Sequence, residues 1–166
     1  MIFVTVGTIL PFDRLMRGID DWVATSGRTD VVGQVGDLSA DSYRPQHFKW
    51  SERLSPVDFR HHIETADVIV AHAGIGTIVD ALTRAKPILI IARQHALHEH
   101  VNDHQLETVA KFADRPGVRV VDQDAQIGSA LEALLQAPAI EPLGPDAQNS
   151  LIGAIKSTIW DTTSQP

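Results

Sequence analysis

The chain has 166 residues, of which 43% are hydrophobic, and it has no cysteine. This composition supports one domain with an ordinary core, and it excludes wholesale disorder, a disulfide framework and a thiolate metal site. The net charge is −7 and the 14 lysine and arginine residues are scattered, which argues against a nucleic-acid-binding protein.

Short apolar strands alternate with amphipathic helices along the chain. Strands are expected over residues 2–6, 30–36, 47–50, 67–73, 87–92 and 118–122. Helices are expected over 11–27, 55–66, 77–85, 102–113 and 124–136. Such alternation predicts right-handed βαβ units and therefore a doubly wound, Rossmann-like α/β fold, with helices on both faces of a parallel sheet.

Several helix ends carry recognisable signals. Pro11 fits the first position of helix 11–27, and Gly27 fits its C-terminal stop. Ser55 and Asp124 fit the N-caps of helices 55–66 and 124–136. One apolar face is expected on helix 102–113, made by Leu106, Val109, Ala110 and Phe112.

The composition changes after residue 136. We expect a compact domain over 1–136, a linker over 137–148, and a C-terminal helix with a tail over 149–166. Apolar residues line one face of that helix, which either folds back on the core or docks on a partner. The N-terminal "MIFVTVG" lacks the basic start of a signal peptide, and no apolar stretch is long enough to span a membrane, so a cytoplasmic location is expected.

Ligands of doubly wound sheets bind beyond the carboxyl ends of the strands, at helix N-termini that attract phosphate. The first such loop holds Gly7, which permits close backbone approach, and Thr8, which offers a hydroxyl and an N–H. An ordinary tight turn is an equal alternative, because one glycine does not make a dinucleotide fingerprint.

The second loop lies in "VIVAHAGIGTIVDAL" (68–82). Gly74 and Gly76 are expected to bend the backbone and to leave room for a ligand at the helix that begins at Thr77. Asp80, one turn into that helix, could accept paired hydrogen bonds from vicinal hydroxyls such as those of ribose. The alternative is that Asp80 only interacts favourably with the helix dipole.

The third loop is "RQHALHEHVNDHQLE" (93–107). Its polar residues Asn102, Asp103 and Gln105 suit a hydroxyl-rich ligand such as a sugar, or else form a helix cap. His100 and His104 have the spacing of a helical metal pair, but the HExxH order is absent. We therefore expect no metal site.

Two of these segments together resemble a known family. "TADVIVAHAGIGTIVDALTRAKPILIIARQ", followed by "NDHQLE", is similar to the C-terminal half of glycosyltransferase family 28, whose members are GT-B enzymes. The likeness extends over about residues 1–135, including "FVTVGT" and "PFDRL" at the start. It is closer to stand-alone C-terminal halves, as in the small subunits of two-part enzymes that act on dolichol-linked sugars or in bacterial exopolysaccharide synthesis.

The resemblance implies roles for residues in all three loops. The Gly7–Thr8 turn would face the diphosphate of a UDP-sugar, and the motif of His72, Gly74, Gly76 and Thr77 would surround the phosphates. Asp80 replaces the usual glutamate that holds the ribose hydroxyls. The donor sugar would contact Asp103 and Gln105, and the uracil would lie near Leu54 and Ser55. His72 is the first choice for a residue beside the phosphates.

GT-B enzymes bind the donor in the C-terminal domain and the acceptor in the N-terminal domain. The resemblance therefore implies a donor-binding subunit that needs a membrane-anchored partner resembling the N-terminal half. The partner would recruit the chain to the cytoplasmic face of the membrane, present a lipid-linked acceptor and supply the general base. No obligatory cofactor is expected. Alternatives are a non-catalytic nucleotide-sugar sensor, a UDP-sugar epimerase-like domain and a flavodoxin-like regulatory domain.

Overall fold

The computed structural model describes residues 1–144, and the expected C-terminal helix therefore lies outside the described residues. The strands are β1 (Ile2–Thr5), β2 (Val31–Gln34), β3 (Lys49–Ser51), β4 (Val68–His72), β5 (Ile88–Ile91) and β6 (Val118–Val120). The helices are α1 (Asp13–Ser26), α2 (Pro56–Thr65), α3 (Ile75–Thr83), α4 (His104–Phe112) and α5 (Ile127–Leu135), with 3-10 turns η1 (His95–Leu97) and η2 (Asp124–Gln126).

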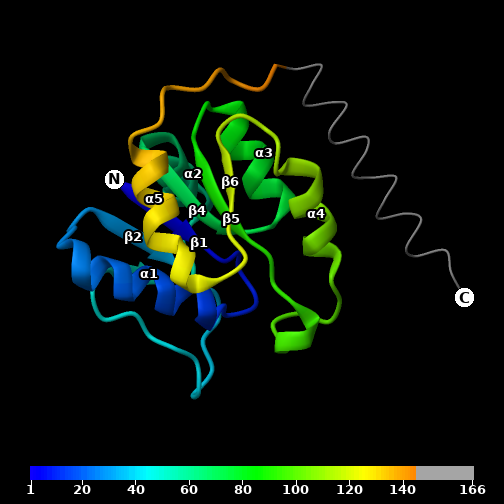
Figure 1. The fold of residues 1–166 in the computed structure, drawn as a ribbon. Coiled ribbons are helices and arrows are strands. Elements are labelled where there is room, and N and C mark those ends of the chain that lie inside the picture. The colour runs from blue at the N-terminus through cyan, green and yellow to red at the C-terminus, as the bar shows by residue number, and fades with distance from the viewer. Residues whose placement is uncertain (145–166) are drawn as a thin grey trace, which may run out of the picture.

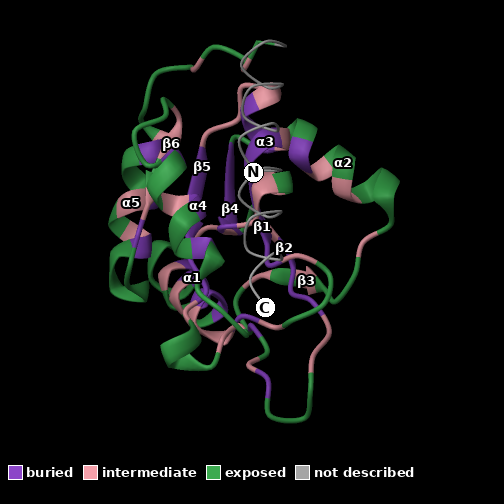
Figure 2. Ribbon diagram, turned by 90° about the vertical axis from the view of Figure 1, so that its right-hand side faces the viewer, coloured by how far each residue is buried: buried purple, intermediate pink, exposed green. Residues whose placement is uncertain are grey.

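The strands form one parallel sheet in the order β3-β2-β1-β4-β5-β6 (Figure 1). Helices cover both faces, so the side chains of the central strands are buried whichever way they point. One apolar cluster joins the sheet to α1 and α5, and a second joins it to α2, α3 and α4. Figure 2 shows the buried strands between helices whose outer sides are exposed. The expected doubly wound α/β fold is confirmed.

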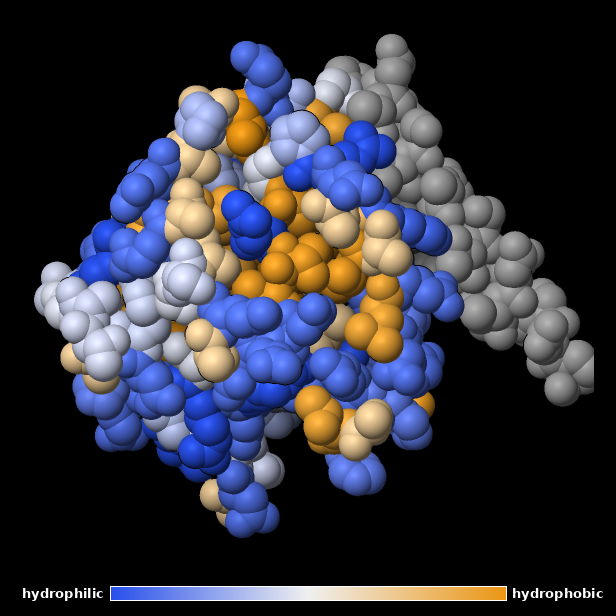
Figure 3. Space-filling view, viewed as in Figure 1, coloured by the Kyte–Doolittle hydropathy of each residue, from blue (hydrophilic) through white to orange (hydrophobic). Residues whose placement is uncertain are grey.

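Strand β6 lies at one edge of the sheet. Val118 and Val120 are half-buried, whereas Arg119 between them is exposed. On the face seen in Figure 1, apolar side chains gather over β5 and β6 (Figure 3). No helix within residues 1–144 has the length and apolar character needed to cross a bilayer.

The residues expected to mark the starts of the first and last helices have other positions in the structure. Helix α1 begins at Asp13 with Phe12 as its N-cap, so Pro11 lies before the helix rather than at its first position. The last helix is preceded by the 3-10 turn η2, whose N-cap is Gln123 rather than Asp124. Its capping box is made by Gln123 and Gln126. The signals at Gly27 and Ser55 are confirmed, since Gly27 is left-handed and the Ser55 side chain accepts the Asp58 N–H.

The apolar face expected on α4 is rotated in the structure. Its buried residues are Gln105, Thr108 and Phe112, whereas Leu106 and Ala110 are exposed. Gln105 can be buried because its Oε1 accepts a hydrogen bond from the Arg93 N–H at 3.0 Å. The periodicity of apolar residues cannot predict that a hydrogen-bonded glutamine is buried on this face of α4.

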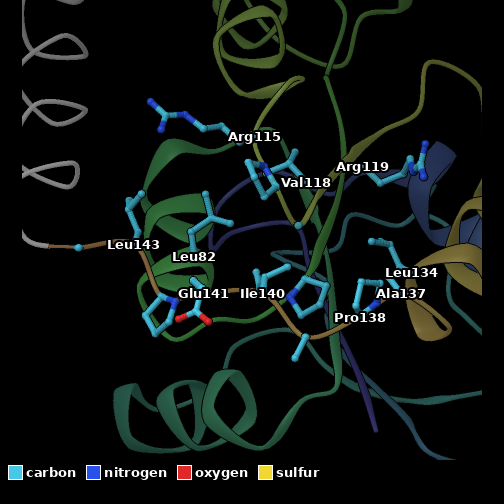
Figure 4. Close-up of a pocket in the computed structure, with 16 residues that line it drawn as sticks. Leu82, Arg115, Val118, Arg119, Leu134, Ala137, Pro138, Ile140, Glu141 and Leu143 are labelled. Carbon is cyan, nitrogen blue, oxygen red and sulfur yellow. The ribbon is translucent and has the colours of Figure 1, made fainter.

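Residues 137–144 pack against the domain rather than standing apart as a linker. Ile140 and Leu143 contact the cluster that includes α3, and the Leu143 N–H donates to the Leu82 carbonyl at 2.9 Å. A pocket of about 580 Å³ lies between this segment, Leu82 and the start of β6. Figure 4 shows Leu82, Val118 and Ile140 gathered around it. Because Val118 opens β6, this pocket lies at the opposite end of the strands from the ligand site expected at their carboxyl ends.

Candidate functional site

The strand order creates a topological switch point between β1 and β4. The chain passes from β1 outward to β2 and β3, and then returns to the other side of β1 to form β4. The loops that follow β1 and β4 therefore run in opposite directions and leave a crevice between them at the carboxyl edge. Gly7 lies in the first of these loops, and His72 is the last residue of β4.

The imidazole of His72 lies between two glycines. A Cβ atom at Gly7 would lie 3.2 Å from His72 Cε1, and one at Gly74 would lie 2.4 Å from His72 Nε2. Gly7 also has a φ of +85°, which side chains rarely adopt. Gly74 has a φ of −87°, so the imidazole rather than a special bend requires a glycine there. The structure thus brings Gly7, His72 and Gly74 together.

His72 is largely buried and its Nδ1 has no hydrogen-bond partner within the described residues. Burial lowers the pKa of His72 to about 4, and the nearby positive charge of Arg93 acts in the same direction, whereas a hydrogen-bonding interaction with the Thr5 backbone opposes the shift only in part. The ring is therefore neutral at neutral pH. An unpartnered buried nitrogen is unfavourable unless a ligand completes it, and this makes His72 a good candidate for a binding residue.

Helix α3 begins beside this histidine. It starts at Ile75, two residues earlier than expected, and its N-cap Gly74 provides no side-chain hydrogen bond. The N–H groups of the first turn are therefore without a side-chain cap, as at a helix N-terminus that binds an anion. Gly76 lies inside this turn rather than at a bend, and no described atom lies within 4 Å of its Cβ position. Open space therefore lies beside Gly76, although the predicted bend is absent there, and its use by a ligand stays a prediction.

Asp80 and Thr77 line a pocket of about 650 Å³ between α2 and α3, together with Gly76 and Phe59. The Asp80 carboxylate accepts a hydrogen bond from Arg84, one turn further along α3. The side chain of Asp80 nevertheless stays 35% exposed. Since a carboxylate has more acceptor sites than this pair uses, Asp80 remains able to accept hydrogen bonds from ribose hydroxyls.

Gln34 connects the loop that contains Gly7 to the segment around Leu54. It was not among the site residues predicted from the sequence. It is 1% exposed. Its Nε2 donates to the Gly7 carbonyl at 2.9 Å, and its Oε1 accepts the Leu54 N–H at 3.0 Å. Gln34 thereby ties the loop after β1 to the segment expected near the uracil. The signal in the sequence is an amide within the otherwise apolar strand "VVGQV" (31–35).

Other predicted residues near these loops have local structural roles. Ser55 caps α2, where its Oγ accepts the Asp58 N–H at 3.1 Å and donates to the Asp58 carboxylate at 2.7 Å. Thr8 is exposed in the loop after β1. Their contacts with a nucleotide stay predictions.

The polar residues of the third loop (93–107) mainly form hydrogen bonds within that loop. Asp103 occupies the N-cap position of α4, but its carboxylate accepts the His95 N–H at 2.8 Å. The Asn102 side chain pairs with the His104 ring. Gln105 is 3% exposed and holds the backbone of Arg93. Direct contact of these residues with a sugar stays a prediction.

His100 and His104 stack edge to face, with 4.6 Å between ring centroids. Both act electrostatically on His72, so the third loop reaches the same region as the switch point. Within residues 1–144, no group of three or more potential ligands is arranged to hold a metal ion. The loops after β1, β4 and β5 therefore surround one polar region.

Known proteins share this sequence pattern and fold. Residues 1–146 match the family described as glycosyltransferase family 28 C-terminal domain. The chain is 27% identical to the UDP-N-acetylglucosamine transferase subunit ALG13 of Mus musculus over 164 residues, which cover 91% of this chain and 14% of that protein. The Homo sapiens protein of the same name is 26% identical over 128 residues, 70% of this chain and 10% of that protein. The chain thus spans a small part of these relatives.

Solved structures show the same fold at low sequence identity. A solution structure of ALG13 superposes with a TM-score of 0.62 at 16% identity, covering 96% of both chains. The UDP-GlcNAc 2-epimerase of Methanocaldococcus jannaschii, in complex with UDP-GlcNAc and UDP, gives a TM-score of 0.59 at 13% identity. It is matched over 95% of this chain and 45% of its own.

Proposed function

Because the chain belongs to the glycosyltransferase family 28 C-terminal domain family, we propose that it is the donor-binding catalytic subunit of a two-component glycosyltransferase. It moves a sugar from a UDP-sugar to a lipid-linked acceptor. The relatives named UDP-N-acetylglucosamine transferase subunits make UDP-N-acetylglucosamine the first donor to test. As in the synthesis of polysaccharide repeat units, the product would be a longer lipid-linked sugar.

The observation that carries this proposal is the neutral His72, whose buried Nδ1 has no hydrogen-bond partner within residues 1–144, between Gly7 and Gly74 at the switch point. Uncapped N–H groups of α3 lie beside it, and together they suit a diphosphate. The pocket beside Asp80 would take the ribose. The third loop would face the sugar, through Asn102, Asp103 and Gln105.

The reaction breaks the bond between the sugar and the β-phosphate of UDP. Negative charge then develops on that phosphate, and fixed N–H dipoles of α3 with the His72 imidazole stabilise it without reorganisation. A hydrogen bond to the leaving oxygen lowers the barrier further. The acceptor hydroxyl must lose a proton to a general base, which we assign to the partner.

The partner would be membrane-anchored and would bind the acceptor. A GT-B active site lies between two domains, and the described residues form one of them. The chain would therefore act at the cytoplasmic face of the membrane only in complex with that partner, which we expect to resemble the N-terminal half of a GT-B enzyme. No nucleic acid takes part.

A transfer assay tests this proposal. The full chain is incubated with UDP-N-acetylglucosamine and a lipid-linked acceptor, with and without a membrane polypeptide first identified by co-purification. We expect transfer only with both proteins, and its loss in His72→Ala. Full-rate transfer by the chain alone would contradict the two-component proposal. Donor binding that changes another activity of the partner, without sugar transfer, would favour a regulatory subunit.

Gln105→Ala tests the sugar side of the proposed site. We expect a larger loss of affinity for UDP-N-acetylglucosamine than for UDP, measured by calorimetry. The variant leaves the Arg93 N–H without its acceptor, which costs about 1–3 kcal/mol of folding stability, so urea unfolding is measured alongside. Equal losses for both ligands would mean that Gln105 supports the loop without contacting the sugar.

A further inference from the structure

Arg93 is a buried cation directly after β5, and nothing above assigns it a role in ligand binding. Its side chain is 2% exposed. The guanidinium donates to the carbonyls of Pro11 at 2.6 Å, Leu10 at 2.7 Å and Val6 at 3.1 Å. It also lies 4.5 Å from the centre of the Phe12 ring. The carbonyls that it binds belong to the loop that contains Gly7.

No carboxylate contacts this guanidinium within residues 1–144. The nearest acid in the loop is Glu99, but its carboxylate binds Arg14 at 2.7 and 2.8 Å and the Gln94 N–H at 3.0 Å. Only the Glu99 backbone carbonyl reaches Arg93, at 3.5 Å. Burial lowers the pKa of Arg93 to about 10, so the group stays charged at neutral pH. Its charge is therefore balanced by the carbonyl dipoles that it contacts and, at longer range, by the Glu99 carboxylate, with which it forms no ion pair.

Folding stability alone does not favour such an arrangement. Removing a guanidinium from water is unfavourable, and apolar residues of similar volume often stabilise a fold as well or better. Arg14 shows the usual arrangement: from helix α1 it also donates to a backbone carbonyl, that of Ala92, but its charge is paired with the Glu99 carboxylate. An unpaired charge at Arg93 is explained if an anion binds nearby. The charge of Arg93 acts on the region around His72, because it disfavours protonation of that ring.

We propose that Arg93 is a positioning residue for the diphosphate of the donor. Its buried charge attracts the anion, and its hydrogen bonds turn the Val6, Leu10 and Pro11 carbonyls away from the crevice. The N–H groups of the loop are then left to face the ligand. This inference rests on the proposed function, since it needs an anionic donor at the switch point.

Two ligands separate the charge effect from other effects. UDP carries the diphosphate and uridine lacks it, so the ratio of their affinities reports the phosphate contribution. In Arg93→Gln we expect that ratio to fall about tenfold, from the loss of one charge at an effective dielectric constant near 20. Arg93→Lys keeps the charge but loses the planar set of guanidinium donors, so we expect a smaller fall, to within about threefold of wild type. Arg119→Gln is the control, because this exposed arginine lies on the edge strand β6, and it should leave the ratio unchanged.

A second measurement needs no ligand. Titration of His72 by NMR should show a higher pKa in Arg93→Gln than in wild type, because the positive charge that disfavours protonation of the ring is removed. If Arg93→Gln does not fold, Arg93→Lys decides: a retained UDP-to-uridine ratio with a low His72 pKa supports the inference. Loss of that ratio in folded Arg93→Lys would overturn it.

The two proposals fail in different ways. If the wild-type chain binds UDP and folded Arg93→Gln keeps both the wild-type ratio and the wild-type His72 pKa, only the role of Arg93 is wrong. If the wild-type chain does not bind UDP, the proposed function is wrong, and this inference falls with it.

Discussion

At the scale of single residues, His72 loses hydration in the fold without gaining a hydrogen bond at Nδ1. An unfolded histidine titrates near pH 6.5, whereas burial holds the pKa of folded His72 to about 4. Between pH 6.5 and pH 4, His72 is therefore mostly protonated in the unfolded chain and mostly neutral in the folded chain. This contribution to stability is therefore complete above pH 6.5 and is lost as the pH falls toward 4.

We predict that His72→Gln removes part of the acid sensitivity of the fold. Between pH 7 and pH 4.5, wild type should lose about 2 kcal/mol of unfolding free energy more than the variant does. Urea unfolding at the two pH values measures this difference. The exposed His61 provides the control, because His61→Gln should keep the wild-type loss. Equal losses in wild type and His72→Gln would contradict a buried, neutral His72.

Asp80 allows a second prediction at this scale. If its carboxylate holds ribose, wild type should bind UDP more tightly than 2′-deoxy-UDP, by about tenfold for a hydrogen bond to a charged group. Asp80→Ala should weaken UDP binding and abolish this preference, as measured by calorimetry. Glu64, a second acid 3.8 Å from Arg84, serves as control, and Glu64→Ala should keep the preference. A preference that survives in Asp80→Ala would exclude the ribose contact.

Individual residues of the site were only partly predictable from the sequence. His72, Gly7 and Gly74 lie together as the pattern indicated. Gln34 and Arg93 were not predicted, because the role of each side chain comes from hydrogen bonds to backbone groups far away in the sequence. Hydrogen bonds across 27 and 83 positions leave no local periodic signal.

At the scale of elements, the apolar periodicity predicted every strand and the long helices. Strands are the most reliable here because those in the centre of a parallel sheet are apolar on both faces. Helix starts were less predictable: Pro11 has the right residue type for a first position, yet the buried Phe12 serves as the N-cap instead. Tertiary packing therefore decides where α1 begins.

The segment 137–144 gives a prediction at this scale. Its prolines and polar residues are typical of a linker, but Ile140 approaches Gly117, where a Cβ would lie 2.4 Å from Ile140 Cδ1. Because Ile140 is partly buried, Ile140→Ala should lower the unfolding free energy by about 1–2 kcal/mol. Urea denaturation measures this, with the exposed neighbour Glu141→Ala as control. No difference between the two variants would show that the segment is a detached linker after all.

At the scale of the whole molecule, the helices on both faces of the sheet leave its carboxyl edge as the place where loops meet. A donor bound there would be exposed on the side away from the domain, where the acceptor must arrive. This geometry supports the proposal that a second polypeptide completes the active site. The acceptor and the general base would be provided by that polypeptide.

The proposed chemistry uses fixed N–H dipoles rather than a metal ion. We therefore predict that transfer by the two-protein complex continues in excess EDTA, at a rate within about twofold of that with Mg²⁺. A radiolabelled-donor assay measures both rates. Abolition of transfer by EDTA, with recovery on adding a divalent ion, would instead indicate a metal site at histidines such as His100 and His104.

The position of the donor is the central claim, and a crystal structure of the full chain with UDP-N-acetylglucosamine tests it most directly. The diphosphate should lie at the carboxyl edge between β1 and β4, against Gly7, His72 and the start of α3, with the ribose beside Asp80. A nucleotide found at the opposite end of the sheet, such as in the pocket beside Ile140, would contradict the account.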